Sequence, residues 1–365
     1  MSVFDTKNNK AICVLPWIHD FSTIQGAKAP CCYANPLQNN QTMQQVRDQM
    51  LAGVQHPACT TCYVKEQKSG WSQRLLETSD WIAKHGEPDT NNPKVNSIDV
   101  RFDNTCNLKC KMCGPHSSTL WQKELGIKIK PGTDNKKYFT GIEKKELKKV
   151  YMAGGEPTYI TTYLEFLEEL HEVNPSCEVI INSNLKRLPD RWKDVIKKFQ
   201  NLTVVCSCDA TEKLASYWRY PLQWDEFSDN VRFVSEHANC LEFNLVASNM
   251  TTHMIHDTCT WMAKFTKNIV IEIIRQPDHF TEAAVPLHTR KRYIEQIDKI
   301  QHFPVALYQA PRFRSVSRWL LKKYHSTPYS PTLHKKLADE IAKQDANRTL
   351  KLQEVDHFLN DWIHG

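Results

Sequence analysis

The sequence predicts an α/β protein built around a parallel sheet that curls toward a partial or full barrel. Six short β-rich runs lie between about residues 97 and 300, and they alternate with stretches that favour amphipathic helices. This alternation is typical of βαβ units, whose right-handed crossovers build a parallel sheet. Ligands of such folds bind at the carboxyl ends of the strands, so the residues after each strand are the first candidates for a functional site.

The elements can be placed in order along the chain. The six strands are expected at 98–103, 148–152, 178–182, 203–207, 242–247 and 269–275. The helices between and after them are expected at 117–125, 164–173, 189–199, 224–238, 252–265 and 289–300, with C-terminal helices at 332–342 and 350–362. A Gly, Pro and Asn cluster at the end of 77–94 indicates a linker. We therefore expect a cysteine-rich domain over 1–93, a core over 94–302 and a helical extension over 303–365.

Composition restricts the class of protein. The 365 residues are 41% hydrophobic and 24% charged, and no apolar run approaches the ~20 residues of a membrane span. Residues 1–10 lack the pattern of a secretory signal, so a soluble protein of the reducing cytoplasm is expected. The net charge is +6, and 122–149 alone carries nine Lys against four acidic residues. This stretch is interpreted as solvated surface, and neither a membrane nor a nucleic-acid partner is expected.

The strongest chemical signal directly follows the first predicted strand. Cys106, Cys110 and Cys113 lie close enough in the chain for their thiolates to bind one metal centre. A [4Fe–4S] cube held by three cysteines keeps one iron without a protein ligand, as a catalytic zinc keeps an open position. The alternative is a zinc knuckle in which His116 supplies the fourth ligand.

This Cys-x3-Cys-x2-Cys spacing after a first strand resembles the signature of the radical S-adenosylmethionine (radical SAM) superfamily. The resemblance implies a partial (β/α)6 barrel, a [4Fe–4S] cluster on Cys106, Cys110 and Cys113, and S-adenosylmethionine on the open iron. Met112 stands where the family usually has an aromatic residue, and it keeps a large apolar side chain that can pack over the adenine.

A second motif follows the second predicted strand. Gly154 and Gly155 let the backbone approach a ligand closely, and Glu156 can place a carboxylate near an ammonium group. Alone, the segment is an ordinary turn. Together with the cysteines it resembles the family's Gly-Gly-Glu motif, which implies that these three residues bind the methionine amino group of the cofactor.

The ends of three later strands carry further matches. Asn182 lies where the family often has a Thr-Asn-Gly turn, and Ser207 and Asp209 resemble a Ser-x-Asp element that reaches the cofactor's ribose or carboxylate. Arg219 lies where related enzymes place an arginine near that carboxylate, which a guanidinium fits bidentately. The alternative interpretation is that Arg219 is a surface cation on an amphipathic segment. Residues 245–249 are a further candidate for contact with the adenine or ribose.

The N-terminal cysteines form the second strong signal. Their pattern resembles the SPASM and twitch modules, which hold auxiliary iron–sulfur clusters in many radical SAM enzymes. The resemblance implies a second, auxiliary [4Fe–4S] cluster on Cys13, Cys31, Cys59 and Cys62. Cys31 is preferred over Cys32 because the family counts five residues from a glycine, here Gly26, to the ligand. Zinc on the same four thiolates is the alternative.

This N-terminal module departs from the family in its place. Such modules usually follow the barrel, whereas here the cysteines precede it and suffice for one auxiliary cluster. Residues 66–74 continue the module's pattern or form a capped amphipathic helix. The other cysteines lie mostly in apolar, strand-like segments and are expected in the core: Cys177, Cys206, Cys208, Cys240 and Cys259.

The resemblance implies reductive cleavage of S-adenosylmethionine to a 5′-deoxyadenosyl radical, which takes a hydrogen atom from a substrate. A peptide or protein is the expected substrate because many enzymes with this auxiliary module act on peptides. The alternatives are oxidation or rearrangement of a small molecule such as a sugar, aminocyclitol or nucleotide, and a non-catalytic metal-binding module. An electron donor such as flavodoxin or ferredoxin is expected as a partner. No catalytic acid or base is identified.

Overall fold

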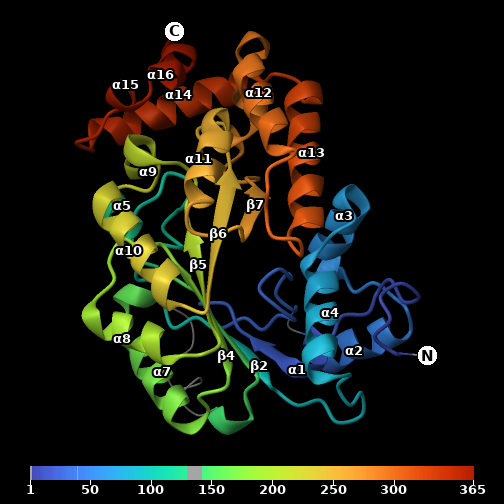
Figure 1. The fold of residues 1–365 in the computed structure, drawn as a ribbon. Coiled ribbons are helices and arrows are strands. Elements are labelled where there is room, and N and C mark those ends of the chain that lie inside the picture. The colour runs from blue at the N-terminus through green and yellow to red at the C-terminus, as the bar shows by residue number, and fades with distance from the viewer. Residues whose placement is uncertain (1, 39, 130–141) are drawn as a thin grey trace. The chain divides into compact units, whose positions relative to one another are not determined.

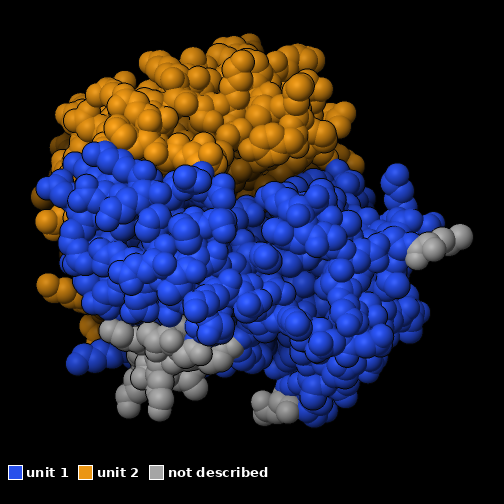
Figure 2. All heavy atoms as spheres, turned by 60° about the horizontal axis from the view of Figure 1, so that its bottom comes forward, with its two compact units in different colours: residues 1–105, 128–182, 190–203 blue, residues 106–127, 183–189, 204–365 orange. Residues whose placement is uncertain are grey.

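The computed structural model of the protein describes residues 2–38, 40–129 and 142–365. The middle of the lysine-rich stretch, residues 130–141, lies outside the described residues. The chain divides into two compact units, coloured separately in Figure 2. Unit 1 comprises residues 1–105, 128–182 and 190–203, and unit 2 comprises 106–127, 183–189 and 204–365. The predicted three-domain division with boundaries near residues 93 and 302 stays a prediction.

The strands form one seven-stranded sheet whose order follows the chain. They are β1 (His19–Phe21), β2 (Ser97–Val100), β3 (Lys149–Met152), β4 (Glu178–Ser183), β5 (Leu202–Ser207), β6 (Cys240–Ala247) and β7 (Ile269–Ile273). The neighbouring pairs β1–β2, β2–β3, β3–β4 and β6–β7 run parallel. The predicted α/β class with a parallel sheet is therefore confirmed.

Helices separate most of these strands. In unit 1 they are α1 (Leu15–Ile18), α2 (Met43–Leu51), α3 (Thr60–Ser69), α4 (Gln73–His85), α7 (Thr161–Val173) and α8 (Asp190–Lys198). In unit 2 they are α5 (Thr119–Leu125), α9 (Glu212–Trp218), α10 (Trp224–His237), α11 (Ile255–Met262), α12 (Arg290–Ile300), α13 (Ala310–Ser326), α14 (Pro331–Ala346), α15 (Leu352–Val355) and α16 (His357–His364). Helices α12 and α13 pack side by side (Figure 1).

Short 3-10 helices complete the described elements. They are η1 (Pro57–Cys59), η2 (Lys144–Glu146), η3 (Pro157–Tyr159), η4 (Thr252–Met254), η5 (Asp278–Phe280), η6 (Glu282–Ala284) and η7 (Leu287–Thr289). No helix among the described residues is both long and apolar enough to cross a membrane.

The N-terminal residues build a small core of their own. Helix α1 contacts both α2 and α4, and these helices lie together in Figure 1. Trp17 of α1 is 1% exposed, and its ring and that of Phe4 form a T-shaped pair with ring centroids 5.1 Å apart. Val46 and Met50 of α2 are fully buried in the same cluster. Cys31 and Cys59 are partly buried and pack against this core.

All six predicted strands are present within a few residues of their expected bounds, but the structure adds β1. This strand has only three residues, and it pairs with β2 from His19 to Phe21. A run this short carries too little alternation to be recognised as a strand.

The predicted linker, the Gly, Pro and Asn cluster that ends 77–94, directly follows a helix. Helix α4 continues through His85 and ends at Gly86, whose φ of 78° suits glycine. The ion pair between Glu77 and Lys149, with Nζ 2.9 Å from the carboxylate, ties this helix to β3 within unit 1. Only the residues after Gly86 remain as linker.

Two corrections concern the C-terminal residues. Helix α13 is not among the expected helices; its Pro311 sits in the first turn, where a missing N–H costs nothing. The single helix expected over 350–362 is instead α15 and α16. The break is at Asp356, which caps α16 by accepting from Leu359 N and also bonds His253 Nε2 at 2.7 Å.

The cysteines expected in the core are mostly there. All thirteen cysteines lie among the described residues, and none of them forms a disulfide. Four of the five predicted core cysteines are at most 2% exposed, namely Cys177, Cys206, Cys208 and Cys259. Cys240 is only partly buried.

Candidate functional site

The three central cysteines lie on an irregular loop of unit 2 whose backbone is held by its neighbours. Lys109 N donates to Tyr220 O at 2.7 Å, and Lys111 N donates to Trp218 O at 2.9 Å. The indole Nε1 of Trp121 donates to Cys110 O at 2.9 Å. The loop is thus fixed in the protein by hydrogen bonds on either side of Cys110.

The three thiols interact with one another. A hydrogen bond between the Cys110 and Cys113 thiols lowers the pKa of Cys113 and raises that of Cys110, because the proton stays on Cys110. The thiol of Cys106 also lies close enough to affect the pKa of Cys113. Such a set of converging thiols is what an iron–sulfur cluster requires, since the thiolate is the form that binds metal.

Arg219 and Asp209 form a buried ion pair beside these thiols. Arg219 Nη2 lies 2.7 Å from Asp209 Oδ2, and the two side chains are 8% and 0% exposed. The guanidinium helps to lower the pKa of Cys113 and opposes the rise in the pKa of Cys110. The interpretation of Arg219 as a surface cation is therefore wrong.

The Asp209 carboxylate already has several donors. Oδ1 accepts from Val246 N at 2.8 Å, and Oδ2 accepts from Trp218 Nε1 at 3.1 Å as well as from Arg219. Burial raises the pKa of Asp209, and these donors oppose that rise. In contrast, Arg219 Nε is buried without a hydrogen-bond partner. The geometry suits Asp209 for orienting Arg219.

Sequence reasoning named Asn182 but missed Asn184. The amide of Asn184 donates to Asn107 Oδ1 at 2.9 Å and to Cys106 Sγ at 3.9 Å, within unit 2. The sequence could have indicated Asn184 as a site residue, since it stands two residues beyond Asn182 at the end of β4. Asn182 and Ser207 lie in the last two residues of β4 and β5, and both are partly buried.

The Gly-Gly-Glu segment lies in unit 1, directly after β3. A Cβ on Gly154 would lie 2.7 Å from Tyr163 Oη, and one on Gly155 would overlap the Thr105 carbonyl. Gly155 N and Glu156 N donate to Asp103 O and Thr105 O at 3.0 and 2.8 Å. Glycine at both positions therefore lets this segment pack closely against residues 103–105, which directly precede Cys106.

The Glu156 carboxylate is 1% exposed. Its Oε1 accepts from the backbone N–H of Thr158 at 3.1 Å and from the Thr158 hydroxyl at 2.7 Å. These bonds cap η3 and hold the carboxylate in one orientation.

The close approach at Gly155 yields a prediction for its alanine variant. Gly155→Ala should lower the free energy of unfolding by about 1–3 kcal/mol, because the Thr105 backbone must move to admit the methyl group. Urea denaturation of the purified variant measures this loss. Gly114→Ala is the matched control, since nothing lies within 4 Å of its Cβ position. Equal free energies of unfolding of the two variants would show that the contact between Gly155 and the Thr105 backbone tolerates a methyl group.

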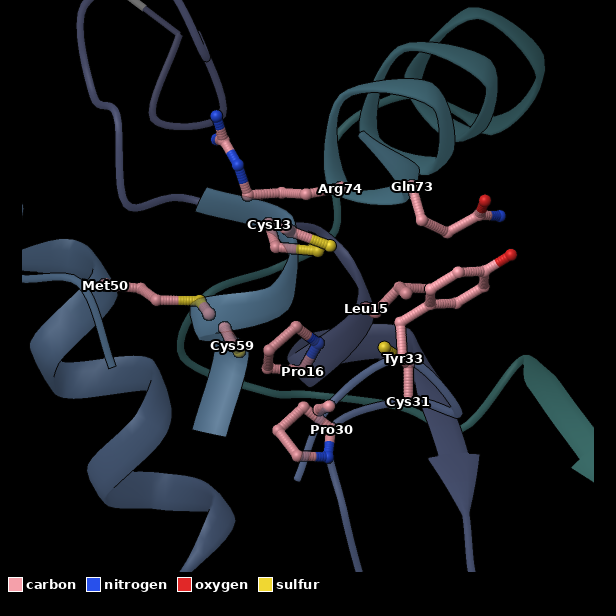
Figure 3. Close-up of a pocket in the computed structure, with 12 residues that line it drawn as sticks. Cys13, Leu15, Pro16, Pro30, Cys31, Tyr33, Met50, Cys59, Gln73 and Arg74 are labelled. Carbon is pink, nitrogen blue, oxygen red and sulfur yellow. The ribbon is translucent and has the colours of Figure 1, made fainter. Parts of the chain in front are cut away.

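The four predicted N-terminal ligands line one pocket of unit 1. Cys13, Cys31, Cys59 and Cys62 surround about 370 Å³ of empty space, including space open to solvent. Figure 3 shows the sulfurs of Cys13, Cys31 and Cys59 around this pocket. Cys32 is exposed and is not among the lining residues.

Burial keeps these thiols protonated. It raises the pKa of Cys59 to about 12 and raises those of Cys13, Cys31 and Cys62 as well. A metal would have to displace these protons, so its affinity for the site should rise with pH. Cys59 and Cys62 stand at the N-terminal end of α3, where the helix dipole favours thiolate.

Arg74 brings a buried cation to the same pocket. It is 2% exposed, and its Nη2 and Nε bond the two carboxylate oxygens of Glu66 at 2.5 and 2.8 Å. Its Nη1 donates to Ile12 O at 2.6 Å, next to Cys13. The segment 66–74 also caps helices, because Gly70 ends α3 and Ser72 begins α4.

Within residues 2–38, 40–129 and 142–365, no three Cys, His, Asp or Glu side chains are placed to share a single metal ion. The thiolates of an iron–sulfur cube each bind a different iron, so they lie farther apart than the ligands of one ion.

No protein-family model matches the chain. No curated protein matches its sequence. Among solved structures it is similar to anSMEcpe with bound AdoMet, at 14% identity and a TM-score of 0.40, over 56% of this chain and 60% of that one. The chain thus covers less than two thirds of anSMEcpe.

Two other solved structures show a similar likeness. SuiB of Streptococcus suis matches at 16% identity and a TM-score of 0.39, over 74% of this chain and 64% of that one. TYW1 with a lysine-pyruvate adduct matches at 12% identity and a TM-score of 0.37, over 59% and 73%. These neighbours are radical SAM enzymes, and SuiB has also been solved with its precursor peptide SuiA. Likeness at this level does not identify a family.

Proposed function

We propose that this chain is a radical SAM enzyme of the partial-barrel type, with a [4Fe–4S] cluster on Cys106, Cys110 and Cys113. The observation that carries the proposal is the mutual interaction of these three thiols beside the buried Arg219. When bound, the cluster supplies the electron that cleaves S-adenosylmethionine, after which a hydrogen atom is taken from the substrate.

The chain's own residues would position the cofactor. Gly154 and Gly155 let their segment pack closely against residues 103–105. The buried Glu156 carboxylate would accept hydrogen bonds from the methionine ammonium group. Arg219, oriented by Asp209, would face the methionine carboxylate, because its Nε still lacks a partner. Asn182 and Ser207 would contact the cofactor from the ends of β4 and β5.

We further propose an auxiliary [4Fe–4S] cluster on Cys13, Cys31, Cys59 and Cys62, in a domain over residues 1–93. The shared pocket supports this assignment, and the buried Arg74 would offset part of the negative charge that four thiolates bring. The barrel core would then span 94–302 and the helical extension 303–365. A cluster here could hold the substrate or accept the electron that remains after hydrogen removal.

The proposed substrate is a peptide or protein. This choice is supported by the resemblance of the N-terminal cysteine pattern to modules found in peptide-modifying enzymes. A one-electron donor such as flavodoxin or ferredoxin would reduce the central cluster.

Anaerobic reconstitution with iron and sulfide tests the proposal. We expect about eight irons per chain and release of 5′-deoxyadenosine after addition of S-adenosylmethionine and dithionite. Full loading without any 5′-deoxyadenosine, both alone and with peptide pools, would point to a non-catalytic metal-binding protein.

Glu156→Gln should weaken the binding of S-adenosylmethionine roughly ten- to hundredfold, because a charge-assisted hydrogen bond is worth about 1.5–3 kcal/mol. The glutamine keeps an oxygen that can accept from Thr158, so the turn and the iron content should be preserved. Equilibrium binding of labelled cofactor to the reconstituted variant gives the affinity. Unchanged affinity would show that the Gly-Gly-Glu segment is an ordinary turn that does not bind the cofactor.

A further inference from the structure

A buried arginine that follows helix α14 lies beside the central cysteine loop of unit 2. The side chain of Arg348 is 0% exposed, and its guanidinium carbon lies 5.1 and 5.2 Å from the ring centroids of Trp121 and Tyr220. We propose that Arg348 offsets the negative charge of the central iron–sulfur cluster and thereby raises its reduction potential. The inference rests on the proposed function, because it takes the central cluster as present.

The two aromatic residues that contact Arg348 also hold the backbone of the cysteine loop. The indole Nε1 of Trp121 donates to Cys110 O at 2.9 Å. The carbonyl oxygen of Tyr220 accepts from Lys109 N at 2.7 Å. Arg348 is thus one side chain removed from Cys110, close enough for its charge to interact with that thiol.

The guanidinium makes no hydrogen bond within the described residues. Its Nε, Nη1 and Nη2 are all buried without a partner. One carboxylate oxygen approaches it, Oε1 of Glu124, which is 3.8 Å from Nη2 and beyond hydrogen-bond distance. Burying a charge is unfavourable unless an opposite charge compensates it, so this cation points to a further negative charge nearby.

The carboxylates near Arg348 are bonded to other cations. Glu124 forms an ion pair with Lys109, and Asp345 Oδ1 lies 3.4 Å from Lys111 Nζ. Burial lowers the pKa of Arg348, but a guanidinium keeps its proton at pH 7. Arg348 therefore keeps a positive charge without a close counter-charge from these groups.

Metal binding would bring the missing negative charge to the loop. A [4Fe–4S]²⁺ cluster on three thiolates is negatively charged, and one electron from the donor takes it to [4Fe–4S]⁺ and makes it more negative. A buried cation stabilises the reduced form more than the oxidised form, because little water screens the interaction. Arg348 would therefore make the central cluster easier to reduce.

The test is a redox titration of the reconstituted full chain with dithionite, followed by electron paramagnetic resonance. The signal of the central cluster is assigned by its absence from the variant that lacks Cys106, Cys110 and Cys113. Arg348→Met removes the charge and keeps an apolar side chain of similar length. At the wild-type midpoint potential its ratio of reduced to oxidised cluster should be roughly tenfold lower, a shift of about 59 mV to more negative values.

Two further variants separate the charge of Arg348 from its packing. Arg348→Lys keeps a positive charge, so its ratio of reduced to oxidised cluster should stay within about threefold of the wild type. Lys343→Met removes an exposed charge of α14 that water screens, and it should titrate like the wild type. Each variant should retain about eight irons per chain, because neither residue is a metal ligand.

Two results overturn the role of Arg348 while leaving the proposed function intact. They are an unchanged midpoint potential in an iron-loaded Arg348→Met variant, and an equally large fall in Arg348→Lys. If no signal depends on the three central cysteines, this role and the proposed central cluster are both wrong. If Arg348→Met does not load iron, Arg348→Gln, which keeps N–H donors without the charge, decides the matter.

Discussion

Replacing Cys106, Cys110 and Cys113 together by alanine is expected to remove about four irons per chain and to abolish cleavage of S-adenosylmethionine. The Cys110 and Cys113 thiols are hydrogen-bonded and Cys106 lies near Cys113, so the three would bind one cluster, and its loss would remove the source of the electron. The backbone bonds from Trp218 and Tyr220 to the loop do not involve these side chains, so the variant should fold. Iron analysis and chromatographic detection of 5′-deoxyadenosine measure the two losses.

Cys32→Ala is the matched control for this variant. Its thiol is exposed and does not line the N-terminal cysteine pocket, so its removal should change neither the iron content nor cofactor cleavage. Cofactor cleavage by the triple variant would refute the central cluster assignment.

The double variant Cys59→Ala, Cys62→Ala is expected to lose the N-terminal metal while keeping about four irons on the central loop. The four-thiolate site contributes its metal-binding energy to folding, so residues before about 94 should exchange their amide protons faster. Cofactor cleavage should persist without turnover of the substrate. Metal analysis and hydrogen exchange by mass spectrometry test these effects.

The identity of the N-terminal metal follows from a related measurement. In the variant that lacks Cys106, Cys110 and Cys113, anaerobic purification should leave about four irons on the N-terminal cysteines. Zinc in their place would rule out an auxiliary cluster, while the radical SAM proposal for the central loop would stand.

The sheet could be predicted from the sequence because its strands are apolar runs separated by long amphipathic helices. Strand β6 illustrates this, since its residues alternate between buried and partly buried positions from Cys240 to Ala247. Strand β1 could not be predicted, because three residues next to a buried helix carry no periodic signal. The break between α15 and α16 at Asp356 could not be predicted either, because it depends on a hydrogen bond to the distant His253.

The residues of the candidate site that lie in short motifs could be predicted from the sequence. The cysteine loop and the two glycines are such motifs, and the structure adds the close approach of Gly155 to Thr105. Asn184 stands two residues beyond Asn182, but its contacts with Asn107 and Cys106 could not be derived from residue spacing.

The backbone bonds that flank Arg219 have a consequence for the thermodynamics of ligand binding. Lys109 N and Lys111 N bond the carbonyls on either side of Arg219, so the arginine and the loop around Cys110 form a single rigid element before any ligand arrives. The conformational entropy of ordering this element is lost during folding and does not have to be lost again on binding. Ligand affinity at this loop should therefore reflect contact energies with little penalty for rearrangement.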